Sequence, residues 1–329
     1  MRKQLHLVFV VIAFAILAPI HLAGAQQAGN MPRIGFLGPG APQTTASCAP
    51  GFSEGLREHG WAEGQNIAIE YRWALGKLDQ LPELAAELVR LPVEVIFAVN
   101  TPAVLAVKQT GTQLPVVFAA VSEPIEIGVV SSLARPGGNF TGLTTMNREL
   151  MPKRLELLKE ALPGLTRVGY LANSTYAGHQ PQLHEMQVAA RSLGIELHLF
   201  EVREGSELEQ AFAGMAAAPV GAFIVQQDVL FGAHRRTIID LAAQRRLPGM
   251  YPGSFYPDDG GLLSYAAHID DLCRRTATYV DKILKGAQPA DLPIERPMKF
   301  ELVINLKTAK GLGLTIPPQL LFQADKVIQ

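Results

Sequence analysis

From residue 33 onward, short apolar runs of β-forming residues alternate with segments whose apolar residues recur every three or four positions. Residues 93–99 are apolar at nearly every position, as in a strand buried on both faces, whereas residues 81–91 place one apolar stripe along a helix. This alternation predicts parallel sheets covered by helices on both faces, an α/β fold. We expect strands at residues 34–37, 67–71, 93–99, 116–121, 167–171, 195–197 and 222–225, and early helices at 50–59, 81–91 and 101–110.

The second half of the chain repeats the order of the first. The segment 33–37 (RIGFL) is echoed by 167–171 (RVGYL), the turn and strand at 60–69 by 192–197, and the strand at 96–99 by 222–225. The offsets of about 134, 128 and 126 residues predict two copies of one doubly wound, Rossmann-like lobe. Between the copies, residues 134–142 contain a proline and paired glycines, so we expect a linker and hinge there and a cleft between the lobes.

The first 25 residues have the three parts of a secretory signal peptide. Arg2 and Lys3 precede an apolar run at 5–18, and Ala23-Gly24-Ala25 supplies the small residues that a signal peptidase reads. Because the run is too short to span a bilayer comfortably, we favour a cleaved signal over residues 1–25 to an uncleaved anchor. We then expect a mature N-terminal tail at 26–32 and a periplasmic protein, without a lipid anchor because no Cys follows Ala25.

The composition of the mature chain argues against nucleic acids and membranes as partners. Without Arg2 and Lys3 it has 27 basic and 30 acidic residues, a net charge of −3. That balance gives no basic footprint, and no later apolar stretch reaches the roughly 18 residues of a membrane span. The 304 mature residues are too many for one small core and suit two lobes. We therefore expect a soluble monomer.

Cys48 and Cys273 are the only cysteines in the sequence. A secreted chain of this length does not need a disulfide to hold its core together, so we favour two unpaired or buried thiols. A disulfide, which would join the first loop to a late helix, is the open alternative, because the sequence does not give the distance between the two Cα atoms.

Two glycine-containing patterns suggest enzymes. Residues 51–55 (GFSEG) match the G-x-S-x-G nucleophile elbow of hydrolases, but the preceding strand ends some 14 residues earlier and Ser53 falls within an expected helix. Gly35, Gly38 and Gly40 follow or lie in the first strand without the spacing of a dinucleotide site. We read the second pattern as a wide loop at the end of the strand, and we expect no catalytic residue.

Two further groups of side chains have the chemistry of metal ligands. His179 and His184 are five residues apart, and Asp258 and Asp259 are adjacent, but neither arrangement has the spacing of a zinc site. We expect solvated surface groups at these positions, and no metal or cofactor.

Polar residues lie just beyond the expected strand ends, where open α/β sheets place their ligands. For Asn100, Thr101, Asn173 and Ser174, helix capping is the competing interpretation. We expect ligand contacts from Pro39, Thr44, Thr45, Asn100, Thr101, Ser122, Glu123, Pro124, Asn173, Ser174, Tyr176, Asp228, Tyr251, Gly253 and Ser254.

Three segments carry a resemblance to a known family. They are Ser122-Glu123-Pro124 together with residues 134–142, the turn at 283–293 (ILKGAQPADLP), and the tail at 299–317 (KFELVINLKTAKGLGLTIP). Over the whole mature chain, the sequence resembles ABC transporter substrate-binding proteins related to tryptophan- and tyrosine-binding lipoproteins. The resemblance implies a type I periplasmic-binding fold, with two lobes joined by three crossing strands and a ligand in the cleft between them. The missing lipobox Cys departs from the lipoprotein members and points to a freely diffusing protein.

On this resemblance, lobe 1 is expected at residues 33–142 plus about 267–299, and lobe 2 at 143–266 plus about 300–329. The implied function is capture of a small polar ligand, such as an amino acid, by hinge closure for an inner-membrane ABC permease. A sugar or a small aromatic acid stays open as the ligand. We expect Glu123 and Asp228 to pair a ligand ammonium, and backbone N–H groups to hold a carboxylate. The alternative functions are a ligand-sensing subunit for a receptor kinase and the secreted hydrolase considered above.

Overall fold

The computed structural model describes residues 31–42, 48–176 and 178–329, and the two lobes described below belong to one compact unit, Arg33–Gln329. The expected signal peptide, residues 26–30 of the expected tail, and the candidate residues Thr44 and Thr45 lie outside the described residues. Two sheets organise the rest, a five-stranded sheet in the order β2-β1-β3-β4-β5 and a seven-stranded sheet in the order β12-β11-β10-β9-β8-β6-β7.

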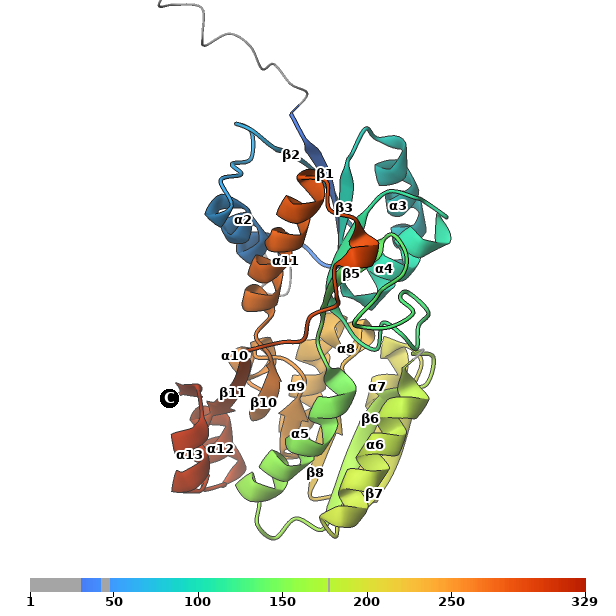
Figure 1. Cartoon of the computed structure of the whole chain (residues 1–329). Coiled ribbons are helices and arrows are strands. Elements are labelled where there is room, and N and C mark those ends of the chain that lie inside the picture. The colour runs from blue at the N-terminus through green and yellow to red at the C-terminus, as the bar shows by residue number, and fades with distance from the viewer. Residues whose placement is uncertain (1–30, 43–47, 177) are drawn as a thin grey trace, which may run out of the picture. The chain divides into compact units, whose positions relative to one another are not determined.

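The first sheet is parallel throughout its described strand pairs. Its strands are β1 (Arg33–Gly38), β2 (Ala68–Trp73), β3 (Val95–Val99), β4 (Val116–Val121) and β5 (Phe140–Thr144). Its helices are α2 (Ala49–Glu58), α3 (Leu81–Arg90), α4 (Asn100–Gln109) and α11 (Ile269–Leu284), with the short turns η2 (Leu78–Gln80) and η4 (Pro289–Asp291). Helices α2 and α11 cover one face of the sheet and α3 and α4 the other (Figure 1). On β3, Phe97 packs toward α2 and α11 whereas Ile96 packs toward α3 and α4, which explains the continuous apolar run.

The second sheet is built in the same way, except that β10 and β11 pair antiparallel. Its strands are β6 (Arg167–Asn173), β7 (Glu196–Val202), β8 (Ala222–Val225), β9 (Gly249–Tyr251), β10 (Leu263–Ala267), β11 (Phe300–Asn305) and β12 (Lys326–Ile328). Its helices are α5 (Asn147–Ala161), α6 (His179–Ser192), α7 (Leu208–Ala217), α8 (Val229–Ala233), α9 (Arg235–Gln244), α10 (Phe255–Asp258), α12 (Leu306–Leu312) and α13 (Pro318–Gln323), with the turn η3 (Gly205–Glu207). Tyr170 and Ile224 face α5 and α6, whereas Leu171 and Val225 face α7 and α9. We call the first sheet with its helices the first lobe, and the second sheet with its helices the second lobe.

Three segments of chain connect the two lobes. They lie between β5 and α5, between β10 and α11, and between η4 and β11. The Thr144 amide donates to the Glu295 carbonyl at 3.0 Å, and the Glu295 amide donates to the Gly142 carbonyl at 3.1 Å. The His268 amide donates to the Lys299 carbonyl at 3.0 Å. The three connections are therefore hydrogen-bonded to one another as they pass between the sheets.

The strands and early helices expected from the sequence are confirmed to within a few residues. The linker expected at 134–142 is only partly correct, because its last residues begin β5, which is buried at every position. Phe140 and Thr141 favour a strand and pair with β4, while the prolines and glycines before them form the turn. The antiparallel β10–β11 pair was not anticipated by the predicted parallel sheets.

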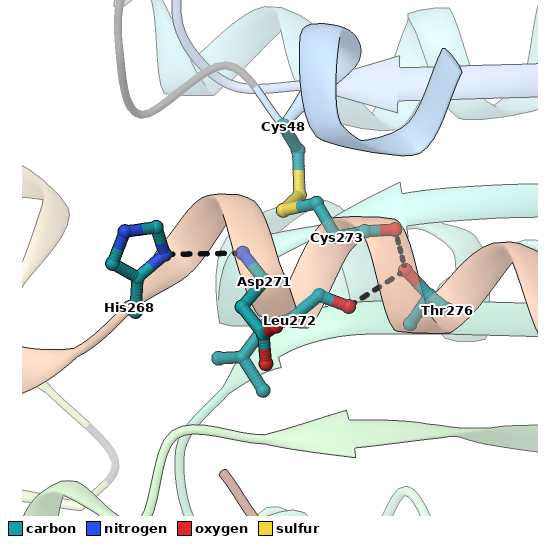
Figure 2. Close-up of a disulfide and its surroundings, with 6 residues drawn as sticks. All are labelled: Cys48, His268, Asp271, Leu272, Cys273 and Thr276. Carbon is teal, nitrogen blue, oxygen red and sulfur yellow. Dashed lines mark hydrogen bonds between the residues drawn. A yellow bond between two sulfur atoms is a disulfide. The ribbon is translucent and has the colours of Figure 1, made fainter. Parts of the chain in front are cut away.

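Cys48 and Cys273 form a disulfide, so the preference for unpaired thiols is wrong (Figure 2). Their Cα atoms lie 5.3 Å apart because α2 and α11 pack together on the same face of the first sheet. Cys48 directly precedes α2, and Cys273 lies early in α11, where the Asp271 amide donates to Nδ1 of His268 at 3.2 Å and so caps the helix.

Among the described residues, no helix is long and apolar enough to cross a membrane.

Candidate ligand site

Ser122, at the end of β4, is the centre of a buried hydrogen-bond network in the first lobe. Its amide donates to Oγ1 of Thr101 at 3.4 Å, and its Oγ lies 3.1 Å from Oγ1 of Thr145. Nδ2 of Asn147 donates to Ser122 Oγ at 2.7 Å and to Thr145 Oγ1 at 3.0 Å. Thr145 and Asn147 lie where the chain first crosses to the second lobe, so the Ser122 hydroxyl is tied to a crossing segment.

Arg154 of α5 extends this network to strand β10. Nη2 of Arg154 donates to Oδ1 of Asn147 at 3.1 Å, and Nε donates to the carbonyl of Tyr265 in β10 at 2.7 Å. Arg154 is fully buried, and none of the described acidic side chains forms an ion pair with it. Burial lowers the pKa of its guanidinium to about 10, which still leaves the group charged at neutral pH. A buried cation therefore connects α5 to β10 beneath the crossing segments.

In the second lobe, Asn173 and Asp228 are brought together at neighbouring strand ends. The Asn173 amide donates to Oε1 of Gln226 at 2.8 Å, and Nδ2 of Asn173 donates to Oδ1 of Asp228 at 3.0 Å. The same carboxylate oxygen accepts the Leu230 amide at 2.9 Å and thereby caps α8. Burial raises the pKa of the Asp228 carboxyl, and these hydrogen bonds only partly oppose that effect.

Glu123 connects the two lobes directly. Its Oε2 accepts a hydrogen bond from the Tyr176 hydroxyl at 2.9 Å, and its Oε1 accepts one from Nε2 of Gln182 at 3.1 Å. Burial raises the pKa of the Glu123 carboxyl, while the bonds from Gln182 and Tyr176 lower it and nearby Glu126 and Glu149 raise it. Burial together with the Glu123 charge also raises the pKa of Tyr176, which therefore stays a neutral donor at physiological pH.

Several buried polar atoms beside this contact lack a partner within the described part of the chain. They are the Tyr170 hydroxyl, Oε1 of Gln182 and Nε2 of Gln226. Gln226 is near enough to lower the pKa of Tyr170, which burial raises, but the geometry between the two side chains falls short of a hydrogen bond. Since buried polar groups are almost always hydrogen-bonded, such atoms mark a region suited to polar ligand groups.

The remaining described candidates are not joined to these groups by side-chain hydrogen bonds. The Pro39 carbonyl accepts the Gly76 amide at 2.8 Å, which joins the segments after β1 and β2, and the Pro124 carbonyl accepts the Val129 amide at 2.9 Å within a turn. Tyr251 stacks on Tyr256 in the core, with ring centroids 4.9 Å apart. The others stand at element ends: Asn100 opens α4, Ser174 follows β6, and Gly253 and Ser254 precede α10.

The patterns weighed as enzyme or metal sites have ordinary structural roles, with one correction. Ser53 is half-buried in the middle of α2, away from any strand end, so it does not form a nucleophile elbow. His184, Asp258 and Asp259 are exposed as expected. His179 is buried instead, because it begins α6 and its ring lies against Glu201 of β7, with Nε2 3.0 Å from a carboxylate oxygen. Among the described residues, no three or more His, Cys, Asp or Glu side chains are grouped so that they could hold a metal ion.

Two surface hollows lie on the second lobe, away from Glu123. One of about 350 Å³ lies between β7 and α7, and one of about 270 Å³ lies between α9 and α12. Neither is lined by Glu123, Asp228 or their hydrogen-bond partners, so we place the candidate ligand site at the hydrogen-bonded groups described above.

Sequence reasoning missed Gln182, Gln226, Asn147 and Arg154. Gln226 directly follows the run 222–225, so the rule that found Asp228 applies to it equally. Arg154 is a charged residue among the apolar positions Met151, Leu155 and Leu158 of one helix face, which is itself a signal. Gln182 lies inside α6, where nothing in the local pattern separates it from a surface glutamine.

Two α/β sheets, each with its carboxyl strand ends near the crossing segments, define a two-lobed periplasmic-binding fold of type I. The chain belongs to the family of ABC transporter substrate-binding proteins, whose sequence pattern it matches over residues 43–328. It is 24% identical over 264 residues to a tyrosine-binding protein of Clostridioides difficile (strain R20291), covering 80% of this chain and 76% of the relative.

Two solved structures extend this similarity. The ABC domain of Streptococcus pneumoniae in complex with L-Trp has a TM-score of 0.84 and 28% identity, over 90% of this chain and 99% of that one. A ligand-free, open substrate-binding protein with adhesive properties from Clostridium difficile has a TM-score of 0.70 and 22% identity, over 91% and 99% of the two chains. The family is one of substrate-binding proteins and not of enzymes.

Proposed function

We propose that this protein captures an amino acid between its two lobes and delivers it to an ABC permease in the inner membrane. In this proposal it acts in the periplasm as a monomer, released from its signal peptide after residue 25 and carrying no lipid. The lobes comprise residues 33–142 plus about 267–299, and 143–266 plus about 300–329. Ligand contacts come from the strand-end residues of both lobes.

The observation that supports the proposal most is the contact of Glu123 in the first lobe with Tyr176 and Gln182 in the second. Side chains that meet across two lobes at the carboxyl ends of their strands are placed where a ligand would touch both lobes at once. The three connections between the lobes are short and give the chain a hinge. A ligand that contacts both lobes binds the closed arrangement more tightly than the open one, and so shifts the protein toward the closed arrangement.

Aromatic L-amino acids are the first ligands to test, because the relatives that carry a ligand name bind tyrosine or L-Trp. Asp228 is suited to the ammonium group, since it is half-buried and no described cation forms an ion pair with it. A bound ligand stabilises the folded protein by about 2.7 kcal/mol at 100 times Kd.

The test is a thermal-shift screen of amino acids, sugars and small aromatic acids, followed by calorimetric titration of each hit. We expect stabilisation by at least one L-amino acid, together with a smaller radius of gyration in small-angle scattering. A flat response to all amino acids, or a hit confined to sugars, would contradict the proposal.

A further inference from the structure

The Glu123 carboxylate is bound by groups of the second lobe, at Tyr176, Gly178 and Gln182, which we call the cradle. Each of its oxygens has its own donor, the Tyr176 hydroxyl on Oε2 and the Gln182 amide on Oε1. An ionised carboxylate only accepts hydrogen bonds, and one donor on each oxygen is the arrangement that a bound carboxylate ligand would have. The donors come from the end of the loop after β6 and from the second turn of α6, so the cradle does not depend on the first lobe.

Gly178 allows the carboxylate to approach the beginning of α6. A Cβ at this position would lie 2.8 Å from Oε2 of Glu123 and 2.7 Å from the Tyr176 ring, both too close. Gly178 precedes the 14-residue helix α6, whose N-terminal end carries partial positive charge. Gln182 is fully buried, and its Oε1 has no partner among the described residues. The cradle thus combines two side-chain donors, a helix end and a position where only glycine leaves room.

Placing Glu123 in this cradle costs free energy, because of its backbone conformation and the burial of its carboxyl. Its backbone has a φ of 42°, in the left-handed region that non-glycine residues rarely adopt. Glu123 as a whole residue is 6% exposed, and burial raises the pKa of its carboxyl. Its described ionic neighbours are Glu126 and Glu149, which raise the pKa further, so only two neutral donors favour the charged form. These conditions destabilise the ionised Glu123 side chain in the cradle. A ligand carboxylate that is accompanied by its own ammonium group can therefore displace it.

We propose that the cradle formed by Tyr176, Gly178 and Gln182 binds the carboxylate of the ligand, and that Glu123 occupies it as an internal substitute when no ligand is bound. This inference rests on the proposed function and narrows the ligand to carboxylate-bearing molecules, which excludes neutral sugars. It gives Glu123 a role different from the one expected from the sequence, since the residue competes with the ligand carboxylate and the ammonium is left to Asp228.

If Glu123 competes with the ligand, removing the Glu123 side chain and altering the cradle should change the affinity for amino acids in opposite directions. Glu123→Ala frees the cradle, so the affinity for L-tyrosine and L-tryptophan should rise, by about tenfold if Glu123 fills the cradle 90% of the time. The affinity for tyramine and tryptamine, which lack the carboxylate, should stay unchanged. Gln182→Leu and Gly178→Ala should lower amino-acid affinity and leave amine binding unchanged.

Two matched variants serve as controls. Glu83→Ala removes an exposed carboxylate of α3 in the first lobe, and Gly164→Ala adds a methyl group where no atom lies within 4 Å. Both should bind like the wild type.

The binding results distinguish failure of this inference from failure of the proposed function. If the wild type binds amino acids and Glu123→Ala binds them equally or more weakly, the inference is overturned and the proposed function stands, with Glu123 as an ammonium partner in the weaker case. If neither protein binds any amino acid, the proposed function fails and this inference fails with it. Circular dichroism and a thermal melt of each variant identify a variant that has simply not folded, in which case Tyr176→Phe replaces it as the cradle variant.

Discussion

Cys48 and Cys273 are joined across 225 residues of sequence, with Cα atoms 5.3 Å apart. The bond connects α2, near the beginning of the first lobe, to α11, which returns to that lobe after most of the second has been formed. The two helices that share one face of the first sheet are thereby fixed to each other covalently.

Loss of this disulfide should destabilise the folded protein. We expect Cys48→Ser with Cys273→Ser to lower the free energy of unfolding by about 2–5 kcal/mol, because the unfolded chain is released from a long closed loop. Urea unfolding followed by circular dichroism measures the change. Reductant should shift the wild-type midpoint and leave the double variant unaffected, and a wild-type midpoint that ignores reductant would contradict the bond.

Gly142→Ala should be strongly destabilising. Gly142 of β5 has a φ of 148°, and a Cβ there would lie 2.0 Å from the Phe118 carbonyl oxygen of β4. Because backbone must move to make room, we expect a loss of more than about 2 kcal/mol in the free energy of unfolding. Gly138→Ala, in the preceding turn, meets no atom within 4 Å and is the matched control. Equal stability of the two variants would show that β4 and β5 are not so closely packed.

Ligand affinity should depend on side chains from both lobes. Ser122→Ala in the first lobe and Asp228→Asn in the second should each weaken binding by about 1–3 kcal/mol, measured by calorimetric titration. Asp240→Asn, on the exposed side of α9, should have no effect. Sensitivity confined to one lobe would favour a site within that lobe.

Both substitutions also affect hydrogen bonds of the ligand-free protein, so stability must be measured in parallel. Asp228 caps α8, and loss of such a cap costs about 0.5–2 kcal/mol. Ser122→Ala leaves Nδ2 of Asn147 bonded to Thr145 and should cost less. Urea midpoints of the unliganded variants separate these losses from lost affinity.

Lowering the pH should stabilise the folded wild type relative to the folded Asp228→Asn variant. Burial raises the pKa of Asp228 above its ordinary 3.8, so the folded protein binds this proton more tightly than the unfolded chain does. The buried charge therefore destabilises the fold above the raised pKa, and the effect disappears as pH falls toward 3.8. The free energy of unfolding of wild type minus that of the variant should rise from pH 7 to pH 4. A constant or falling difference would contradict the burial of a charged Asp228.

Asp281 of α11 should respond with the opposite sign. Burial alone would raise its pKa, but hydrogen bonds from Lys285 and Trp61, with the nearby charges, hold it below 3.8. The stability that its ionised form contributes is complete above 3.8 and is lost as pH falls through the lowered pKa. Compared with Asp281→Asn, wild type should therefore lose its advantage below about pH 4. Urea unfolding across this pH range checks the sign, and an advantage that grew on acidification would be inconsistent with it.

Much of the fold was predictable from the sequence because local apolar periodicity determines it. The run at residues 93–99 reads as a strand buried on both faces, and β3 (Val95–Val99) lies within it. The stripe in 81–91 faces the sheet as α3. β5 was read as a linker because Pro136, Gly137 and Gly138 mark a turn immediately before it, and only pairing with β4 reveals the strand.

The candidate site was predictable only where its residues directly follow strands. Ser122, Asn173 and Asp228 meet that condition and take part in hydrogen-bonded groups at the strand ends. The contact of Glu123 with Gln182 joins residues 59 positions apart on different lobes, and nothing local records such an approach. The disulfide was missed for the same reason, since two distant helices must pack before the thiols can meet.

The placement of α11 has a consequence for the order in which the protein can fold. A chain that emerges from its N-terminus has all five strands of the first sheet by residue 144, but α11 ends only at residue 284. Until then, the face of that sheet that carries Phe97 and Val117 lacks one of the two helices that cover it. Completion of the first lobe thus waits for a contact between distant parts of the chain, and contacts of this kind slow folding and leave apolar surface exposed until they form. The disulfide between Cys48 and Cys273 can form only when that contact is made.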